Sequence, residues 1–132
     1  MSFKGIPFEN QIGDNLCYCN AGTNALLSSE KITSEIRQSH CAICDFLYSM
    51  KNADPYSTYS TIPLKSFVAY FKPEFETNEQ QDTDEFVQCL LSKCDILKKL
   101  TRSVLHVKYT CKRCGTETDH QEEMNILYLE KE

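Results

Sequence analysis

Glycine, proline and positive charge are all scarce in this sequence, and each shortage excludes a class of protein. Four glycines and four prolines among 132 residues exclude a fibrous or low-complexity chain. The net charge of -5 argues against nucleic-acid binding, which usually needs a basic surface. No apolar run approaches the length of a membrane span, and the first residues lack the apolar stretch of a signal peptide. We therefore expect a globular protein of the cytoplasm or nucleus, with no membrane or nucleic-acid partner.

Cysteine is the residue in excess. In the reducing compartment expected here, cysteines are predicted to be free or bound to metal. Cys89 and Cys94 fall on an apolar stripe at helical spacing, which predicts small buried side chains. The eight positions are Cys17, Cys19, Cys41, Cys44, Cys89, Cys94, Cys111 and Cys114.

The order of the predicted elements indicates an α+β fold with the helices first. Apolar residues recur at helical spacing through the first hundred positions, and the period changes after Lys99. We predict a single domain over 1–132, with a helical unit at 1–101 and a β ribbon at 102–132. The predicted helices span residues 18–29 (weakened by Gly22), 34–51, 63–71 and, from a cap at Asp82 or Thr83, 83–94; the predicted strands span 104–109 and 125–129.

The first chemical motif surrounds Cys17, at the predicted start of a helix. Backbone N–H groups in a first helical turn stabilise a thiolate, which is the nucleophile of thiol peptidases. A nearby amide side chain can donate to the oxyanion of acyl transfer, and Asn10 and Asn15 are the candidates. The alternative is a cysteine and an asparagine that only cap and pack a helix.

Two further motifs follow along the chain. Gln80-Gln81-Asp82 opens an amphipathic helix, where polar residues are commonly caps. Cys111 and Cys114 lie in a C-x-x-C-G turn between the predicted strands, and such a turn offers two of the four thiolates of a zinc site.

The three motifs in this order resemble the ubiquitin-specific protease family. The segment around Cys17 is similar to the family's G-N-T-C-Y-x-N-(S/A) box, residues 80–86 match its Q-Q-D-x-x-E-F helix, and 111–114 match the entry of its fingers. The resemblance implies the thumb-like amino-terminal part of a papain-like fold, with a two-stranded antiparallel extension that carries the C-x-x-C turn.

The same resemblance implies roles for individual residues. Cys17 matches the thiol that attacks the isopeptide bond after ubiquitin's C-terminal glycine. Gln80, Gln81 and Asp82 match the segment near the bound ubiquitin tail, which makes ubiquitin the implied partner and implies that this segment packs beside the start of the Cys17 helix. Cys111 and Cys114 match the first half of the zinc site in the fingers.

The sequence also departs from the family. The family's oxyanion asparagine falls at Ile12, so Asn10 or Asn15 takes that role or nothing does, and the glutamine of the nucleophile helix corresponds to Asn24. The half that bears the catalytic histidine is not matched. The three histidines present, His40, His106 and His120, do not fit its context.

For metal, two interpretations of Cys111 and Cys114 stay open. In one, zinc binds and the missing ligands come from Cys41 and Cys44, from His120, or from a second copy of the chain. In the other, the pair is metal-free. Cys41 and Cys44 themselves are either ligands beside His40 or small buried residues on a helix.

Two functions therefore compete. The first is an active deubiquitinating thiol peptidase, as a fragment of a larger protein or completed by another chain. The second is a catalytically incomplete interaction or assembly module that acts through a dimer or another protein partner. The unmatched histidine half favours the second for this chain, and predicts that the isolated chain is inactive.

Overall fold

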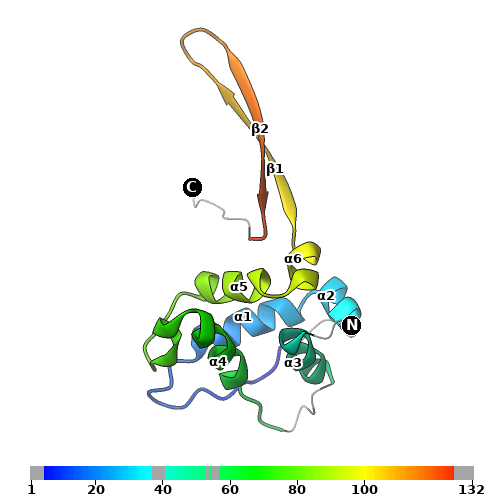
Figure 1. Cartoon of the computed structure of the whole chain (residues 1–132), viewed down its shortest axis with the longest axis vertical. Helices are drawn as coiled ribbons and strands as arrows, with labels where there is room; N and C mark the ends of the chain where they lie inside the picture. Colours follow the sequence, from blue (N-terminus) through cyan, green and yellow to red (C-terminus); the bar gives the residue numbers. More distant parts are fainter. Residues whose placement is uncertain (1–4, 37–40, 53, 55–56, 127–132) are drawn as a thin grey trace.

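The helices of this chain pack into one body, and a long β ribbon leaves that body beside the last helix (Figure 1). The computed structural model describes residues 5–36, 41–52, 54 and 57–126. The predicted α+β class is confirmed. The elements are α1 (Cys17–Leu27), α2 (Glu30–Glu35), α3 (Ala42–Lys51), α4 (Ile62–Phe71), the 3-10 helix η2 (Pro73–Glu76), α5 (Thr83–Ser92), α6 (Asp95–Leu100), β1 (Ser103–Thr110) and β2 (Glu117–Met124).

Capping residues explain where several helices begin. The Ser29 hydroxyl accepts a hydrogen bond from the Ile32 N–H and starts α2. The predicted cap at Asp82 is confirmed, because its carboxylate accepts the backbone N–H groups of Asp84 and Glu85 at the start of α5. Pro63 lies in the first turn of α4, as expected, where its missing N–H costs no helical bond.

Two predicted helices are wrong in extent. The prediction over 34–51 merges α2, which ends at Glu35, with α3, which begins at Ala42, and its residues 37–40 lie outside the described ones. The prediction over 83–94 merges α5 with α6. In both cases a cysteine has extended backbone immediately before a helix: Cys41 at φ -84 and ψ 140, and Cys94 at φ -131 and ψ 105. Apolar spacing alone does not register such a break.

The ribbon pairs two antiparallel strands, with Val107 opposite His120 and Ser103 opposite Met124. The first strand confirms the prediction over 104–109. The second strand is Glu117–Met124, so the prediction over 125–129 is wrong for 125 and 126, and 127–129 lie outside the described residues. The sequence of β2, ETDHQEEM, is polar at nearly every position.

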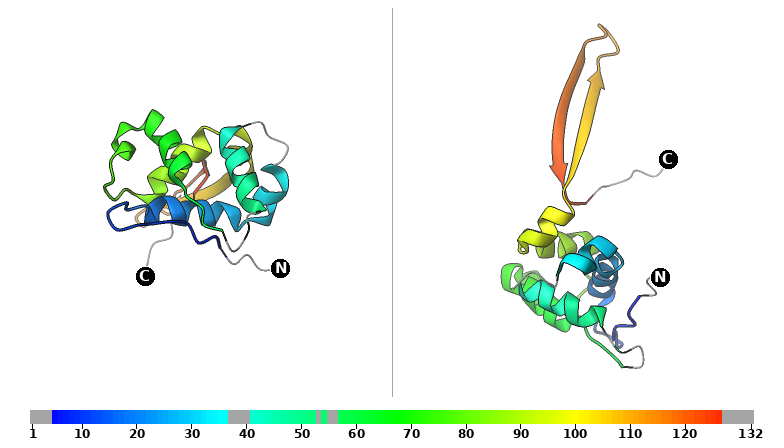
Figure 2. Two further views of the ribbon diagram at one scale, coloured as in Figure 1. Left: turned by 90° about the horizontal axis from the view of Figure 1, so that it is seen from below. Right: turned by 90° about the vertical axis from the view of Figure 1, so that its right-hand side faces the viewer.

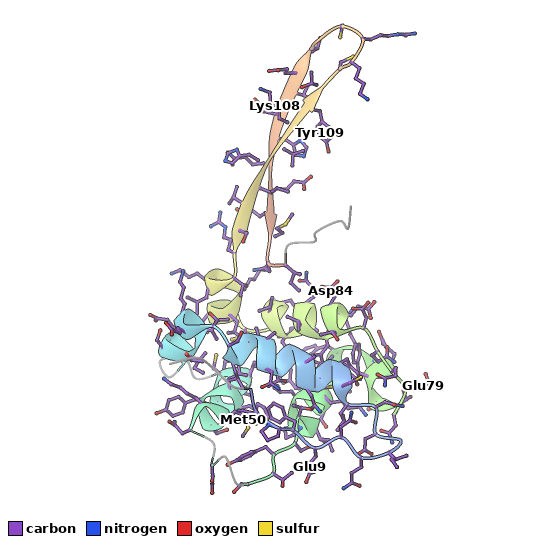
Figure 3. All side chains as sticks on the ribbon, turned by 180° about the vertical axis from the view of Figure 1, so that it is seen from behind. Glu9, Met50, Glu79, Asp84, Lys108 and Tyr109 are labelled. Atoms are coloured by element: carbon purple, nitrogen blue, oxygen red, sulfur yellow. The ribbon has the colours of Figure 1, made fainter. Side chains whose placement is uncertain are left out.

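This polarity follows from the surroundings of the ribbon. Figure 2 shows it extending from α6 away from the helices, and nearly all its residues are exposed on both faces. A strand with no buried face needs no alternation of apolar and polar residues, so hydrophobic periodicity misses it. In Figure 3 its side chains, among them those of Lys108 and Tyr109, project into solvent on either side.

The core of the helical body forms where α1 meets α5 and η2. Tyr18 is buried there, and its ring makes edge-on contacts with Phe75 and Phe86, each with ring centroids 5.7 Å apart. Gly22, on the same helix, lets α5 approach closely. A methyl group at Gly22 would lie 2.8 Å from Val87 Cγ2 and 3.2 Å from Phe86 Cδ1. Among the described helices, none is long and apolar enough to cross a bilayer.

We predict that Gly22→Ala lowers the free energy of unfolding by about 1 kcal/mol, within a range of about 0–2 kcal/mol, measured by urea denaturation. Alanine gains about 1 kcal/mol in helix propensity, but overpacking a buried contact costs about 1–3 kcal/mol, and the valine has little rotamer freedom in a helix. Val87→Ala in the Gly22→Ala background should recover most of the loss. A more stable Gly22→Ala protein would contradict the close packing of α1 and α5.

Candidate active site

The segment before α1 is folded by its own side chains. The Asn10 Oδ1 atom accepts the Leu16 N–H at 2.9 Å, which closes the turn. Gly13 and Asn15 have positive φ, 90° and 51°. Glycine adopts this conformation freely, and asparagine tolerates it better than most residues. The turn places Cys17 as the first residue of α1, with an exposed side chain.

A chain of hydrogen bonds joins this turn to the segment before α5. The Cys17 thiol donates to Gln80 Oε1, with Sγ and Oε1 3.0 Å apart. Gln80 Nε2 donates to Asn15 Oδ1 at 3.0 Å, and Asn15 Nδ2 donates to the Asn78 carbonyl at 2.7 Å. The prediction that Cys17 lies at a helix start beside 80–82 is therefore confirmed. We call Cys17, Gln80, Asn15 and Asn78 the amide relay.

The far end of the amide relay sets the direction of every bond in it. The Asn78 carbonyl can only accept, so Asn15 must present its Nδ2 group there and its Oδ1 atom to Gln80. Gln80 must then donate through Nε2, which leaves Oε1 facing the sulfur. The Cys17 thiol is therefore the donor in its bond with Gln80 Oε1.

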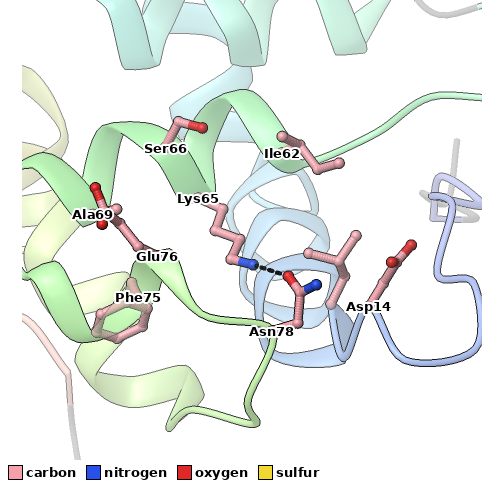
Figure 4. Close-up of a pocket in the computed structure, with 9 residues that line it drawn as sticks. Asp14, Ile62, Lys65, Ser66, Ala69, Phe75, Glu76 and Asn78 are labelled. Carbon is pink, nitrogen blue, oxygen red and sulfur yellow. Dashed lines mark hydrogen bonds between the residues drawn. The ribbon is translucent and has the colours of Figure 1, made fainter.

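Next to the Asn78 end of the amide relay lie a buried lysine, Lys65, and a pocket. Lys65 is only 8% exposed, and its Nζ atom donates to Asn78 Oδ1 at 3.1 Å, as the dashed line in Figure 4 shows. A pocket of about 270 Å³ adjoins this pair. Sequence reasoning missed Lys65 and Asn78, since neither falls in a motif. The residues that line the pocket are Asp14, Leu16, Ile62, Lys65, Ser66, Ala69, Phe75, Glu76 and Asn78.

The other two residues of the Q-Q-D segment have structural contacts. Gln81 Nε2 donates to the Glu74 carbonyl at 3.2 Å, which ties the segment to η2. Asp82 caps α5 through Oδ1, and its side chain is exposed at the positive end of that helix. Their expected contact with a ubiquitin tail stays a prediction.

The two candidate oxyanion donors, Asn15 and Asn10, have different hydrogen-bonding roles in the structure. Both ends of the Asn15 amide are used within the relay. Asn10 uses its Oδ1 atom to hold Leu16, and its Nδ2 group stands outside the relay. Asn24, at the family's glutamine position, binds Ile6 through both of its side-chain atoms, at 2.7 and 3.0 Å, and so fastens the entry segment to α1.

The described histidines lie on the ribbon and not on the helical body. His106 is in β1 and His120 in β2. The His120 ring stacks on Tyr109 with centroids 5.4 Å apart, and its Nε2 atom lies 2.9 Å from Glu122 Oε1. His40 is outside the described residues.

Three cysteines meet at a point away from Cys17. The sulfur atoms of Cys41, Cys44 and Cys94 all lie within 4.8 Å of one another, and those of Cys44 and Cys94 are 3.3 Å apart. These thiols could hold a metal ion. Burial raises the pKa of the Cys94 thiol far above its ordinary value, and hydrogen bonds with Cys41 and Cys44 raise it further. The prediction that Cys94 belongs to an apolar stripe of α5 is wrong, because it precedes α6 and faces this cluster.

The C-x-x-C turn stands at the tip of the ribbon. Cys111 and Cys114 are both exposed, and Gly115, at φ 72°, donates its N–H to the Cys111 carbonyl. The Thr116 hydroxyl, 3.0 Å from Cys114 Sγ, is the main cause that lowers the pKa of that thiol to about 7. Among the described residues, the three-ligand grouping does not include this pair, so Cys41 and Cys44 do not complete a site with it.

The fold and the site define a class of protein in which an exposed cysteine begins one helix, α1, and contacts a Q-Q-D segment that leads into another, α5. The sequence profile of the ubiquitin carboxyl-terminal hydrolase family matches residues 9–127. The chain belongs to that family, which confirms the resemblance to ubiquitin-specific proteases. A comparison with curated proteins found no match.

We predict that Gln80→Leu accelerates alkylation of Cys17 by iodoacetamide about 2–5-fold at pH 7, because the hydrogen bond that engages the Cys17 thiol is removed. Gln80→Glu should slow the reaction, since a carboxylate repels the thiolate. Site-resolved mass spectrometry separates Cys17 from the other exposed cysteines. Gln81→Leu, which alters a bond to η2, is the matched control and should leave the rate unchanged. Slower alkylation in Gln80→Leu would contradict the assigned polarity of the relay.

A second prediction concerns Cys114. Because its pKa is lowered to about 7, its alkylation rate should rise from pH 6 to pH 8 with a midpoint near pH 7. Thr116→Val removes the hydroxyl donor and should move the midpoint to higher pH. The same mass-spectrometric assay reports both profiles. A midpoint unchanged by Thr116→Val would show that this hydroxyl does not stabilise the thiolate.

Proposed function

We propose that this chain carries the nucleophile of a deubiquitinating thiol peptidase, in which Cys17 attacks the isopeptide carbonyl after the ubiquitin C-terminus. The observation that carries the proposal is the 3.0 Å contact between Cys17 Sγ and Gln80 Oε1, which joins two motifs 63 residues apart. A cysteine that merely packs a helix needs neither exposure nor an ordered amide partner. Family membership supports this reaction class.

The surface beside Cys17 supports a peptide-binding role. Gln81 fixes the backbone of the segment on η2, and Asp82 adds an exposed carboxylate one position further. This carboxylate suits a basic peptide that approaches the thiol along the start of α5. For the oxyanion, the Nδ2 group of Asn10 is the better candidate, because Asn15 is committed to the relay.

We propose further that these 132 residues bind ubiquitin without turning it over. A general base must take the thiol proton and later pass it to the leaving amine. Gln80 is a neutral amide and performs neither step, while His106 and His120 lie on the ribbon. The imidazole is therefore proposed to come from outside the described residues, either from a larger protein of which this chain is a fragment or from a protein partner, which includes a second copy of the chain.

A second candidate function is a binding or assembly module without catalysis. Exposed aromatic and aliphatic side chains on α4 favour it, since Tyr70 is 82% exposed and Ile62 50% exposed. The ribbon favours it as well, because a two-stranded sheet leaves both outer edges open to another strand.

We predict that the isolated chain does not hydrolyse a fluorogenic ubiquitin substrate above the level of Cys17→Ala. It should still bind ubiquitin in calorimetry, and Asp82→Ala should weaken that binding about 3–10-fold by removing a charged contact. Ubiquitin with a C-terminal propargyl group should label the wild type slowly and Cys17→Ala not at all.

Each outcome separates the candidates. Turnover that depends on Cys17 would overturn the claim that an imidazole comes from outside. A chain that neither binds ubiquitin nor reacts with the propargyl probe would contradict the peptidase proposal and favour the assembly module. Sedimentation velocity would then be expected to show a dimer.

A further inference from the structure

The three clustered thiols come from the starts of two helices that are far apart in sequence. Cys41 is the residue before α3, Cys44 lies in its first turn, and Cys94 is the residue before α6. The other buried cysteines, Cys19 and Cys89, are not in this grouping. Small apolar packing explains a single buried cysteine, but does not require three sulfur atoms from separate segments at one point.

The distances fit a metal better than a covalent bond. In a tetrahedral zinc site with Zn–S bonds of about 2.3 Å, the sulfur atoms are about 3.8 Å apart. The observed sulfur atoms are 3.3 Å apart for Cys44 and Cys94, and all three pairs are within 4.8 Å. Shifts of about half an ångström to one ångström would give the tetrahedral spacing.

The spacing of the cysteines and their burial also suit a metal. Cys41 and Cys44 have the C-x-x-C separation common in zinc sites. Cys44 and Cys94 are buried, at 0% and 1% exposed, while Cys41 is partly exposed. The cluster is thus closed toward the core and open toward solvent on the Cys41 side, which gives an ion a path of entry.

We propose that Cys41, Cys44 and Cys94 form a zinc site that fastens α3 to α6. Three thiolates bind the ion, each thiol releasing its proton to solvent, and the fourth position is left to water or an added ligand. The site is distinct from the C-x-x-C turn at the ribbon tip. It holds the helix from which the ribbon starts, since α6 ends at Leu100 and β1 begins at Ser103. This proposal does not depend on the peptidase function.

The test is the metal content of the full chain, purified with a reductant and without chelator, by plasma mass spectrometry. We expect about one zinc ion per chain in the wild type and in a Cys111→Ser, Cys114→Ser double variant. Cys94→Ser should lose the zinc. Cys89→Ser is the matched control, because it alters a buried cysteine of the preceding helix outside the cluster, and it should keep the metal.

A measurement on the wild type covers the case in which Cys94→Ser does not fold. A strong chelator should lower the melting temperature, and zinc should restore it, because an ion that binds only the folded chain stabilises it. Cobalt in place of zinc should give a sulfur-to-metal charge-transfer band that persists in the Cys111→Ser, Cys114→Ser variant. Three results would overturn the proposal. The first is less than about a tenth of an equivalent of zinc per chain, and the second is a Cys44–Cys94 disulfide that persists in the presence of the reductant. The third is zinc that is lost in the Cys111→Ser, Cys114→Ser variant but retained in Cys94→Ser.

Discussion

The close approach of α1 to α5 is the constraint on which the site depends. Gly22 has no side chain to separate the two helices, and Val87 and Phe86 occupy the space that a methyl group would take. Because the two helices pack so closely, the start of α1 and the segment before α5 come within hydrogen-bonding distance, and Cys17 contacts Gln80. A core contact one and a half turns away thus fixes the position of the exposed Cys17 thiol.

A backbone carbonyl sets the direction of the hydrogen bonds in the amide relay. The Asn78 carbonyl permits only one orientation of Asn15, and through it only one orientation of Gln80. Lys65 binds the Asn78 side chain from the pocket, so a positive charge secures the end of the chain that lies farthest from the sulfur. The direction of the hydrogen bond between Cys17 and Gln80 is consequently set by two asparagines that do not touch the sulfur.

Sequence reasoning found what local motifs encode and missed what tertiary contacts create. Cys17 and Gln80 stand in motifs of residue type and order, so their meeting could be predicted. Lys65 matters because it is buried against Asn78, and the sequence of a largely apolar helix does not reveal that a lysine in it is buried. Cys94 matched the helical period, yet its backbone is extended, because it begins a new helix. The strand β2 was missed because both of its faces are exposed, so no apolar pattern selects its residues.

Because the ribbon starts directly after α6, a small change in the tilt of α6 gives a large displacement at the ribbon tip. Eight residues per strand at about 3.4 Å each give an arm of about 27 Å. A tilt of about 10° at the base therefore sweeps the tip, with Cys111 and Cys114, through about 5 Å. Any displacement of α6 is enlarged along the ribbon, and the proposed zinc site would restrict it because Cys94 immediately precedes α6.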